Sequence, residues 1–332
     1  MADVVRKKIG VVDDKEYWWN VTADCLEVRI PDVREAIQAR QYRRILSADY
    51  SQVEIKIMAY LSRDKALIEA INSGCDVHSY NAAKVFGKRM NFTYEDLETA
   101  RHTHNDPKGL ILVRNRIKTT SFGVPYGAGA SRIALMTGME MDDAEEFINT
   151  FFETFHDLKK WIDNQGMQAI RFRRYPFSEV ALGYSTTPRG RKRFMPEPER
   201  NSEYDKSIKQ IKRWAGNQPI QSSNVDMLKM AMANIYKDIR GGNPAAPCIY
   251  DAQFLLAVHD EIVMEVLEDH VDPVKAIMEH RMNEAYWSVI PRWDLEDKKN
   301  PGCNLFGEPL IRMPFGVLNR IDVVVSNQWE KA

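Results

Sequence analysis

The sequence predicts an α+β fold in which strands near both ends of the chain enclose a mostly helical middle. Short apolar runs typical of buried strands occur at residues 44–48 and 321–326, and residues 254–266 form two apolar runs around a polar centre. Helical spacing of apolar residues dominates between them, most clearly at 143–168 and 208–240. Because the strands lie far apart in sequence but need one sheet, we expect the helices to be an insertion.

The composition indicates a folded chain with one large lobed domain or two. Its 332 residues are 44% hydrophobic and 28% charged, which suffices for a core and excludes a disordered chain. The four cysteines stand too far apart for a zinc cage and do not suggest a disulfide framework. No apolar run approaches about 18 residues, and the N-terminus lacks the layout of a signal peptide. We therefore expect a soluble cytoplasmic protein with no membrane partner.

The net charge of −1 excludes a uniformly basic nucleic-acid-binding protein, but the two signs are separated along the chain. Residues 159–213 contain 14 Lys and Arg against six Asp and Glu, mixed with Gly, Pro and aromatic residues that suit phosphate contacts. Residues 251–332 contain eight basic against 15 acidic residues. One charged run alone is most often a solvated face. A basic middle with an acidic tail indicates a protein that binds polyanions and cations at different places.

Local patterns place the elements of the first hundred residues. An extended piece at 25–30 is followed by a helix at 32–40 and the buried strand at 44–48. A further helix begins near Val53, where apolar residues recur at helical spacing. Its common face consists of Val53, Ile57, Tyr60 and Leu61. The polar, Pro-containing stretch 88–108 predicts a surface excursion.

The second half repeats this alternation of helices and strands. Gly216 and Pro219 predict breaks in the helical pattern of residues 208–240, and the sequence GGNPAAP predicts a loop at 241–247. Residues 254–266 then predict a hairpin, because two apolar runs flank a short polar, acidic turn.

Two carboxylates stand at the ends of predicted strands. Asp49 directly follows the strand at 44–48, and Asp260 lies at the hairpin tip beside Glu261. Each residue alone is commonly a helix cap or a turn residue. If both strands deliver their carboxylates to the same edge of a sheet, the pair can hold two hard cations for the displacement of a phosphoryl group.

Two sets of residues recur at helical spacing, and each would form a stripe along one face of a helix. Arg114, Lys118, Phe122 and Tyr126 recur every fourth residue, so on a helix they form one stripe about 18 Å long. A triphosphate at the cationic end and a base at the aromatic end would fit this order, and a surface stripe with aromatic packing is the structural alternative. The second stripe, whose members can all donate hydrogen bonds in a minor groove, is Arg213, Asn217 and Gln221.

Four segments together resemble one known family, the DNA polymerase I-like (family A) DNA polymerases. DYSQVEIKIMAYLSRD, with DVHSYNAAKVFG downstream, resembles the first palm motif, and RNRIKTTSFGVPYG resembles the fingers-helix motif. NQPIQSSNVDMLKMAM resembles the minor-groove motif, and LLAVHDEIVMEV resembles the second palm motif. All four occur in the order of the family, from about Ile30 to the closing strand. The resemblance also suggests a phage or phage-like source, which would place the protein in the host cytoplasm.

The resemblance implies a metal site and an activity. Asp49, Asp260 and the backbone carbonyl of Tyr50 would bind two Mg²⁺ ions, with Mn²⁺ as a substitute, and Glu261 would be an auxiliary catalytic carboxylate. The implied reaction is template-directed DNA synthesis, in which a primer 3′-hydroxyl attacks the α-phosphate of a dNTP.

The remaining motif residues would contact the two substrates. Lys118 would also protonate the pyrophosphate leaving group, and Glu54 would exclude a ribose 2′-hydroxyl. The implied dNTP contacts are Arg114, Lys118, Phe122, Tyr126, Gln52, Glu54 and His78. The implied contacts to primer-template DNA are Arg213, Asn217, Gln221 and His259.

Some motif positions depart from the family pattern. Pro125 predicts a kink in the fingers helix immediately before Tyr126, which affects the direction of that ring. The other departures are Lys56 for Arg, Ser121 for Asn, Ser222 and Ser223 for Gly-Thr, and Ala257 for a polar residue.

The resemblance also implies a domain organisation. Residues 1–64 would form the first part of a palm with an antiparallel sheet, residues 65–205 the fingers, and residues 206–332 the second part of the palm. About 45 residues precede Asp49, too few for the thumb of the family, and no exonuclease carboxylates are found. We therefore expect the thumb and exonuclease domains to be absent from this chain, which would be a separately encoded half, a truncated gene or an excerpt of a longer protein.

Two other functions stay open at this point. A catalytically idle DNA-binding or interaction half would need a thumb-bearing partner, but the intact carboxylates and fingers stripe oppose it. A single-subunit phage-type RNA polymerase shares the two aspartates and a fingers Lys and Tyr, but Glu54 opposes it, since a carboxylate there should exclude ribose.

Overall fold

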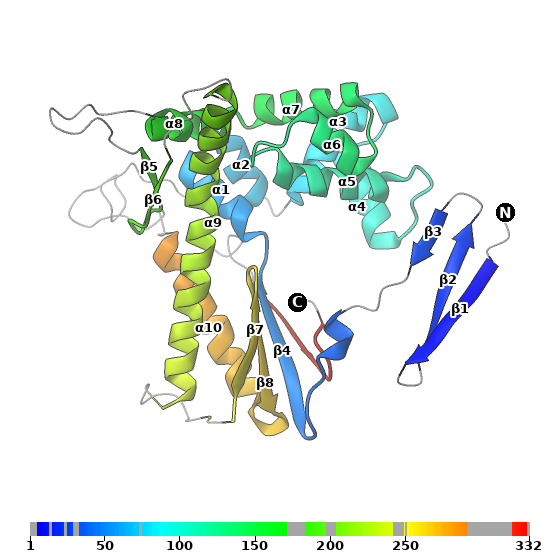
Figure 1. The fold of residues 1–332 in the computed structure, drawn as a ribbon, viewed down its shortest axis with the longest axis vertical. Coiled ribbons are helices and arrows are strands. Elements are labelled where there is room, and N and C mark those ends of the chain that lie inside the picture. The colour runs from blue at the N-terminus through cyan, green and yellow to red at the C-terminus, as the bar shows by residue number, and fades with distance from the viewer. Residues whose placement is uncertain are drawn as a thin grey trace.

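The computed structural model describes residues 5–12, 15–22, 25–28, 33–72, 75–170, 183–196, 204–241, 249, 251–290 and 321–330. A four-stranded antiparallel sheet lies at one end and a group of helices at the other (Figure 1). The predicted α+β fold class is confirmed. No helix among these described residues is long and apolar enough to cross a membrane. Apart from Gly241, the loop predicted at 241–247 lies outside the described residues.

The sheet joins strands from both ends of the chain, as predicted. Its order is β7 (Gln253–Val258), β8 (Glu261–Leu267), β4 (Arg43–Tyr50) and β9 (Ile321–Ser326). All neighbours are antiparallel, and β4 lies between β8 and β9. The predicted hairpin is confirmed, since β7 and β8 are joined by a two-residue turn.

The two faces of the sheet are covered differently. On one face, Leu46 and Ala48 pack against α9 (Tyr204–Ile239) and α10 (Val271–Val289), both of which run along the sheet in Figure 1. On the other face, Ile45 and Val263 form a small cluster with Trp329. This alternation has the period of two expected for a strand that is buried on both sides.

The described part of the helical region after β4 contains eight helices before the β5–β6 hairpin, which comprises β5 (Tyr184–Thr186) and β6 (Lys192–Phe194). It packs around one continuous core with the helix-covered face of the sheet. The eight helices are α1 (Val53–Ser62), α2 (Lys65–Asn72), α3 (Val77–Met90), α4 (Tyr94–Thr103), α5 (Leu110–Gly123), α6 (Ala130–Thr137), α7 (Met141–Thr154) and α8 (His156–Ile170).

The segment before β4 differs from its prediction. Instead of a helix at 32–40, the chain forms a single 3₁₀ turn, η1 (Val33–Ala36), and then runs extended. Backbone pairing explains the difference, because the Ala39 N–H donates to the Asn327 carbonyl (2.8 Å) and the Trp329 N–H donates to the Ile37 carbonyl (2.9 Å). Long-range hydrogen bonds have thus overridden the local helical pattern.

A small antiparallel sheet precedes that segment. It consists of β1 (Val5–Val12), β2 (Lys15–Thr22) and β3 (Cys25–Val28). Strand β3 coincides with the extended piece predicted at 25–30, whereas β1 and β2 were not predicted.

The stretch predicted as a surface excursion at 88–108 contains helix α4. Its first turn has a capping box, in which the Asp96 N–H donates to the Thr93 hydroxyl and the Thr93 N–H donates to the Asp96 carboxylate. Leu97 and Ala100 are its buried residues. The other side chains of α4 are exposed or half-buried, so the stretch lies at the surface as predicted. The helix itself was not predicted, because only two apolar side chains anchor it.

Helix α5 ends before Tyr126, the last residue of its predicted stripe. The Val124 N–H donates to the Thr120 carbonyl, and residues 124–127 form a turn in which Gly127 has φ +80°. Pro125 therefore follows the helix instead of kinking it, as is common just beyond a helix C-terminus. Tyr126 leaves the helical stripe as a consequence.

Helix α9 is continuous through Gly216 and Pro219, so the predicted breaks are wrong. A Cβ at Gly216 would lie 3.3 Å from a methyl group of Ile162, so the absence of a side chain lets α8 and α9 cross closely. Pro219 is buried, and the Ser223 hydroxyl donates to its carbonyl at 2.6 Å. Packing against α8 and α10 stabilises this helix despite the hydrogen bond that proline removes.

Asp64 divides the helical segment that the sequence predicts from Val53 onward. Its carboxylate accepts from the N–H of Leu67 (3.0 Å) in α2 and from those of Asp157 (3.0 Å) and Leu158 (3.1 Å) in α8. Asp64, His156 and Asp157 also place potential metal-ligand atoms within 4.8 Å of one another. Because three backbone donors engage the carboxylate, capping of two helices accounts for this buried charge.

Substitution of Asp64 by Ala is expected to lower the free energy of unfolding by about 2–4 kcal/mol, the sum of two helix caps. Urea unfolding followed by circular dichroism would measure the loss. Asp163→Ala is the matched control, because Asp163 is exposed and pairs only with Lys159 one turn away, an interaction worth about 0.5 kcal/mol or less. Equal effects of the two substitutions would contradict the capping role.

Candidate active site

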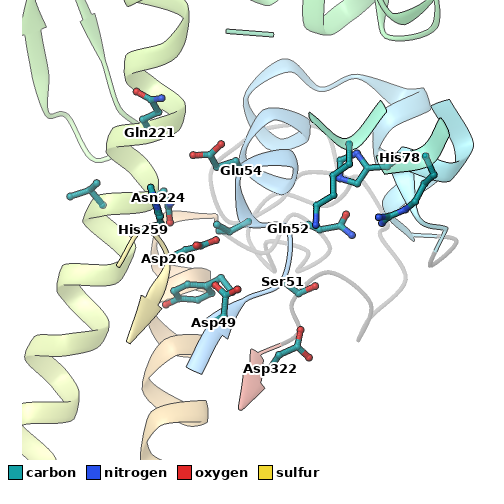
Figure 2. Close-up of a pocket in the computed structure, with 15 residues that line it drawn as sticks. Asp49, Ser51, Gln52, Glu54, His78, Gln221, Asn224, His259, Asp260 and Asp322 are labelled. Carbon is teal, nitrogen blue, oxygen red and sulfur yellow. The ribbon is translucent and has the colours of Figure 1, made fainter. Parts of the chain in front are cut away.

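An open cleft of ≈ 860 Å³ lies between the end of the sheet and the helices α1, α3, α5 and α9 (Figure 2). Most of the residues that line it are polar, and they include acidic and basic side chains. The residues that line it are Asp49, Tyr50, Ser51, Gln52, Val53, Glu54, His78, Arg114, Lys118, Gln221, Asn224, Val225, His259, Asp260 and Asp322.

Neighbouring strands bring two carboxylates to the floor of the cleft. Asp49 is the penultimate residue of β4, and Asp260 belongs to the turn between β7 and β8. That turn is tight because His259 adopts a left-handed conformation with φ 56°. Tyr50 lines the same cleft although its ring is buried, and its hydroxyl donates to the Met282 carbonyl (2.9 Å).

Three carboxylates form a row across the sheet. Asp49 pairs directly with Glu261 on β8 and with Asp322 on β9, so the three side chains project from the same face. Glu261 is buried and does not line the cleft, because the Ser47 hydroxyl and the Trp329 indole N–H (2.7 Å) both donate to it. Asp322 lines the cleft, which thus has Asp49, Asp260 and Asp322 on its sheet side.

The opposite wall carries positive charge from α5. Arg114 forms a bidentate pair with Asp76, with its Nη2 at 2.7 Å and its Nε at 3.3 Å from the two carboxylate oxygens. Asp76 also caps α3 by accepting from the Ser79 N–H at 2.7 Å. Burial opposes ionisation, but Arg114 and the Ser79 amide together hold the pKa of Asp76 at about 2. Lys118 follows one turn later on α5 and is exposed to the cleft.

His78 lies on α3 behind this wall. It is almost completely buried, and burial lowers its pKa to about 4, although the nearby carboxylate of Asp76 opposes the shift. At neutral pH the ring is therefore uncharged, with one nitrogen as a donor and the other as an acceptor.

Glu54 lines the cleft, and Tyr126 holds its carboxylate from beside the cleft. The Tyr126 hydroxyl donates to the Glu54 carboxylate at 2.5 Å. Burial raises the pKa of Glu54, the negative charge of Asp260 adds to the increase, and the Tyr126 hydrogen bond opposes it. The position of Tyr126 in the turn after α5, instead of on the helix, allows this contact.

Only one member of the second predicted stripe lines the cleft, namely Gln221. Asn217, one turn earlier on α9, is half-buried and has its Nδ2 3.5 Å from the Tyr126 carbonyl. Arg213 is exposed and lies against Gly127, where an added Cβ would approach its side chain to 3.1 Å. The stripe therefore runs from the turn after α5 into the cleft.

The model of DNA polymerase family A matches residues 26–295 of the sequence, a range that includes nearly all of this cleft. The chain belongs to DNA polymerase family A.

Individual relatives agree with this family A assignment. The chain is 32% identical over 260 residues to the thermostable DNA polymerase I of Thermus filiformis, with 78% of this chain and 27% of the relative covered. It is 31% identical over 254 residues to DNA polymerase I of Mycobacterium leprae, with 75% and 24% covered. The chain thus spans about a quarter of the length of these curated relatives.

A solved structure shows the same fold as this family A chain. It is the POL domain of Pol1 from M. smegmatis, in complex with DNA primer-template and dNTP. The TM-score is 0.63 at 24% sequence identity, and the match covers 94% of this chain and 46% of the other. The predicted palm sheet with a helical fingers insertion agrees with this likeness.

Most of the residues singled out in the sequence meet in one cleft of the family A chain. Those that line it are Asp49, Tyr50, Gln52, Glu54, His78, Arg114, Lys118, Gln221, His259 and Asp260. Tyr126, Asn217 and Arg213 lie beside it, whereas Glu261 is buried under it, and their functional roles stay predictions. Phe122 belongs to α5, but its side chain lies outside what the structure describes.

The residues that the sequence analysis did not predict as site residues include Asp322, Asn224 and Val225 in the cleft and Asp76, which supports Arg114. Asp322 was not predicted, because its place in the cleft depends on its pairing with Asp49 in the folded sheet. Asn224 and Val225 follow Gln221 by three and four residues, so the helical period could have found them. Asp76 was part of a quoted motif, but its contact with Arg114 across 38 residues was not anticipated.

Proposed function

We propose that this chain performs template-directed DNA synthesis, joining dNTPs to a primer 3′-hydroxyl as the palm and fingers portion of a family A polymerase. The observation that carries the proposal is the juxtaposition of Asp49 and Asp260 with Arg114 and Lys118 in one cleft. Carboxylates on one wall suit cations, and guanidinium and ammonium groups on the other suit a triphosphate.

The donor set of the cleft fits divalent magnesium or manganese. Hard cations prefer carboxylate and carbonyl oxygens, which Asp49, Asp260 and the backbone of Tyr50 supply from adjoining positions. When bound, two such ions would activate the primer hydroxyl and stabilise the charge that develops on the leaving pyrophosphate.

The protein side chains would orient and neutralise the substrates. Arg114, held by Asp76, would keep its remaining N–H groups for triphosphate oxygens, and Lys118 would add a second positive charge and a proton for the leaving group. Glu54, fixed by Tyr126, would occupy the space next to the sugar. Gln221 and His259 would contact the primer-template near the hairpin tip.

The predicted division of the chain belongs to the same proposal. Residues 1–64 and 206–332 would act as the palm and residues 65–205 as the fingers. A separately encoded thumb-bearing partner would complete the grip on the duplex, as the sequence analysis predicts.

Primer extension tests the proposal. The purified chain is incubated with a fluorescent primer-template, dNTPs and Mg²⁺ or Mn²⁺, alone and with candidate thumb-bearing partners. We expect metal-dependent extension that copies the template, with short products in the absence of a partner. A folded chain that extends no primer in either arm would refute the catalytic proposal, and DNA binding without extension would favour the idle DNA-binding half.

Sugar selectivity separates this proposal from an RNA polymerase. The chain is expected to incorporate dATP in strong preference to ATP, because the Glu54 carboxylate, held by Tyr126, would leave no room for a 2′-hydroxyl. Glu54→Ala should reduce this preference by raising kcat/KM for ATP. A preference of the unmodified chain for ATP would contradict the DNA assignment.

A further inference from the structure

Asn224 is a polar cleft residue that none of the roles above uses. It lies on α9 and is only 7% exposed, yet it lines the cleft. Its Oδ1 is buried without a hydrogen-bond partner among the residues that the structure describes. A buried acceptor without a donor is costly and rare in native proteins, so it calls for a missing partner.

The position of Asn224 indicates where that partner would come from. The spacing Arg213–Asn217–Gln221–Asn224 is 4, 4 and 3 residues, which keeps all four side chains close to one face of α9. Asn224 is the member of this stripe at the sheet end. Figure 2 draws it between α9 and the hairpin tip that carries His259 and Asp260.

We propose that Asn224 is a primer-positioning residue whose amide accepts a hydrogen bond from the 3′-terminal nucleotide of the primer. The proposal rests on the proposed function, in which the terminal 3′-hydroxyl must lie next to Asp49 and Asp260. That nucleotide offers two kinds of donor on this side, its sugar hydroxyl and, when the base is guanine, the 2-amino group in the minor groove.

Asn224→Ala and Asn224→Leu test the role. Leu keeps the volume of the side chain without its polar atoms, so agreement of the two variants excludes an effect of an empty cavity. We expect kcat/KM for primer-template to fall by about 2–13-fold, the factor that one hydrogen bond typically contributes. The KM for dNTP should stay unchanged. Asn234→Ala is the matched control, since Asn234 lies on the same helix and donates to Glu284 outside the cleft.

Thermal unfolding separates positioning from a structural role. Because the buried Oδ1 has no protein donor among the described residues, its removal should leave Tm unchanged or raise it. A fall in Tm for both Asn224 variants with unchanged kinetics would assign a structural role and overturn the proposal.

Binding measurements identify the donor. Fluorescence anisotropy compares primers that end in a 3′-hydroxyl or a dideoxy sugar, and in guanine or hypoxanthine, which lacks the 2-amino group. The unmodified chain should discriminate within one of these pairs, and Asn224→Ala should lose that discrimination. If the unmodified chain binds and extends primers but discriminates within neither pair, the inference fails while the proposed function stands. If it neither binds nor extends, both fail.

Discussion

Asp260→Asn is expected to abolish primer extension while leaving the fold at least as stable as before. The turn between β7 and β8 tolerates Asn, and the substitution removes one negative charge from a cleft wall that also carries Asp49 and Asp322. The loss of activity should exceed the roughly 10–100-fold cost of losing a residue that only supports a metal ligand. Single-turnover extension and thermal unfolding measure the two effects.

The same substitution should also change the pKa of Glu54. Asp260 contributes to the raised pKa of Glu54, so its neutralisation should bring that pKa closer to the usual range. Asp272→Asn, an exposed residue in the first turn of α10, removes the same charge away from the cleft and should leave extension unchanged. Activity of Asp260→Asn close to that of the unmodified chain would contradict the assignment of this carboxylate.

Asp76→Asn is expected to raise the KM for dNTP more than it lowers kcat, because Arg114 loses its bidentate partner. In an Arg114→Ala background the same substitution should have little further effect on KM, since Asp76 would act on the triphosphate through Arg114 under the proposed function. Asp143→Asn, which breaks the more exposed pair with Arg89, is the control. Additive effects of Asp76→Asn and Arg114→Ala would contradict this coupling.

The stability that the Asp76–Arg114 pair contributes to the fold should decrease as the pH falls. Its pKa is about 2 in the folded chain against an ordinary value of 3.8, so the folded state favours the ionised form. This difference contributes about 2 kcal/mol that is fully present above pH 4. As the pH falls from about 4 to about 2, the unmodified chain should lose this advantage over Asp76→Asn. Urea unfolding at pH 7 and pH 3 measures the difference.

The parts of the fold that follow from local patterns were predictable. The strand before Asp49, the hairpin around Asp260 and the strand containing Asp322 are short apolar runs bounded by polar residues, and they form the sheet as expected. The cleft followed from these strands together with the Arg114–Lys118 spacing on α5.

Features that depend on distant contacts were not predictable. Helix α9 passes through Pro219 because α8 and α10 pack along it, and the segment around Ile37 is extended because it pairs with the chain after β9. In the sequence, Asp64 fits the helical pattern, and its role as a cap depends on contacts with α8 that the pattern does not contain. In each case a long-range interaction outweighs a local preference of about 1–3 kcal/mol.

The close crossing of α8 and α9 has a mechanical consequence. Gly166 meets the Lys212 side chain and Gly216 meets Ile162, so the two helices interlock and cannot slide past each other without collision. Helix α9, with 36 residues and a length of about 54 Å, also packs against α10 beside the sheet. Helix α9 therefore holds α8 at a fixed position relative to the sheet. Gln221 and Asn224 on α9 therefore keep a fixed position relative to the sheet, and a movement of Arg114 and Lys118 toward them would have to come from the helices that do not pack against α9.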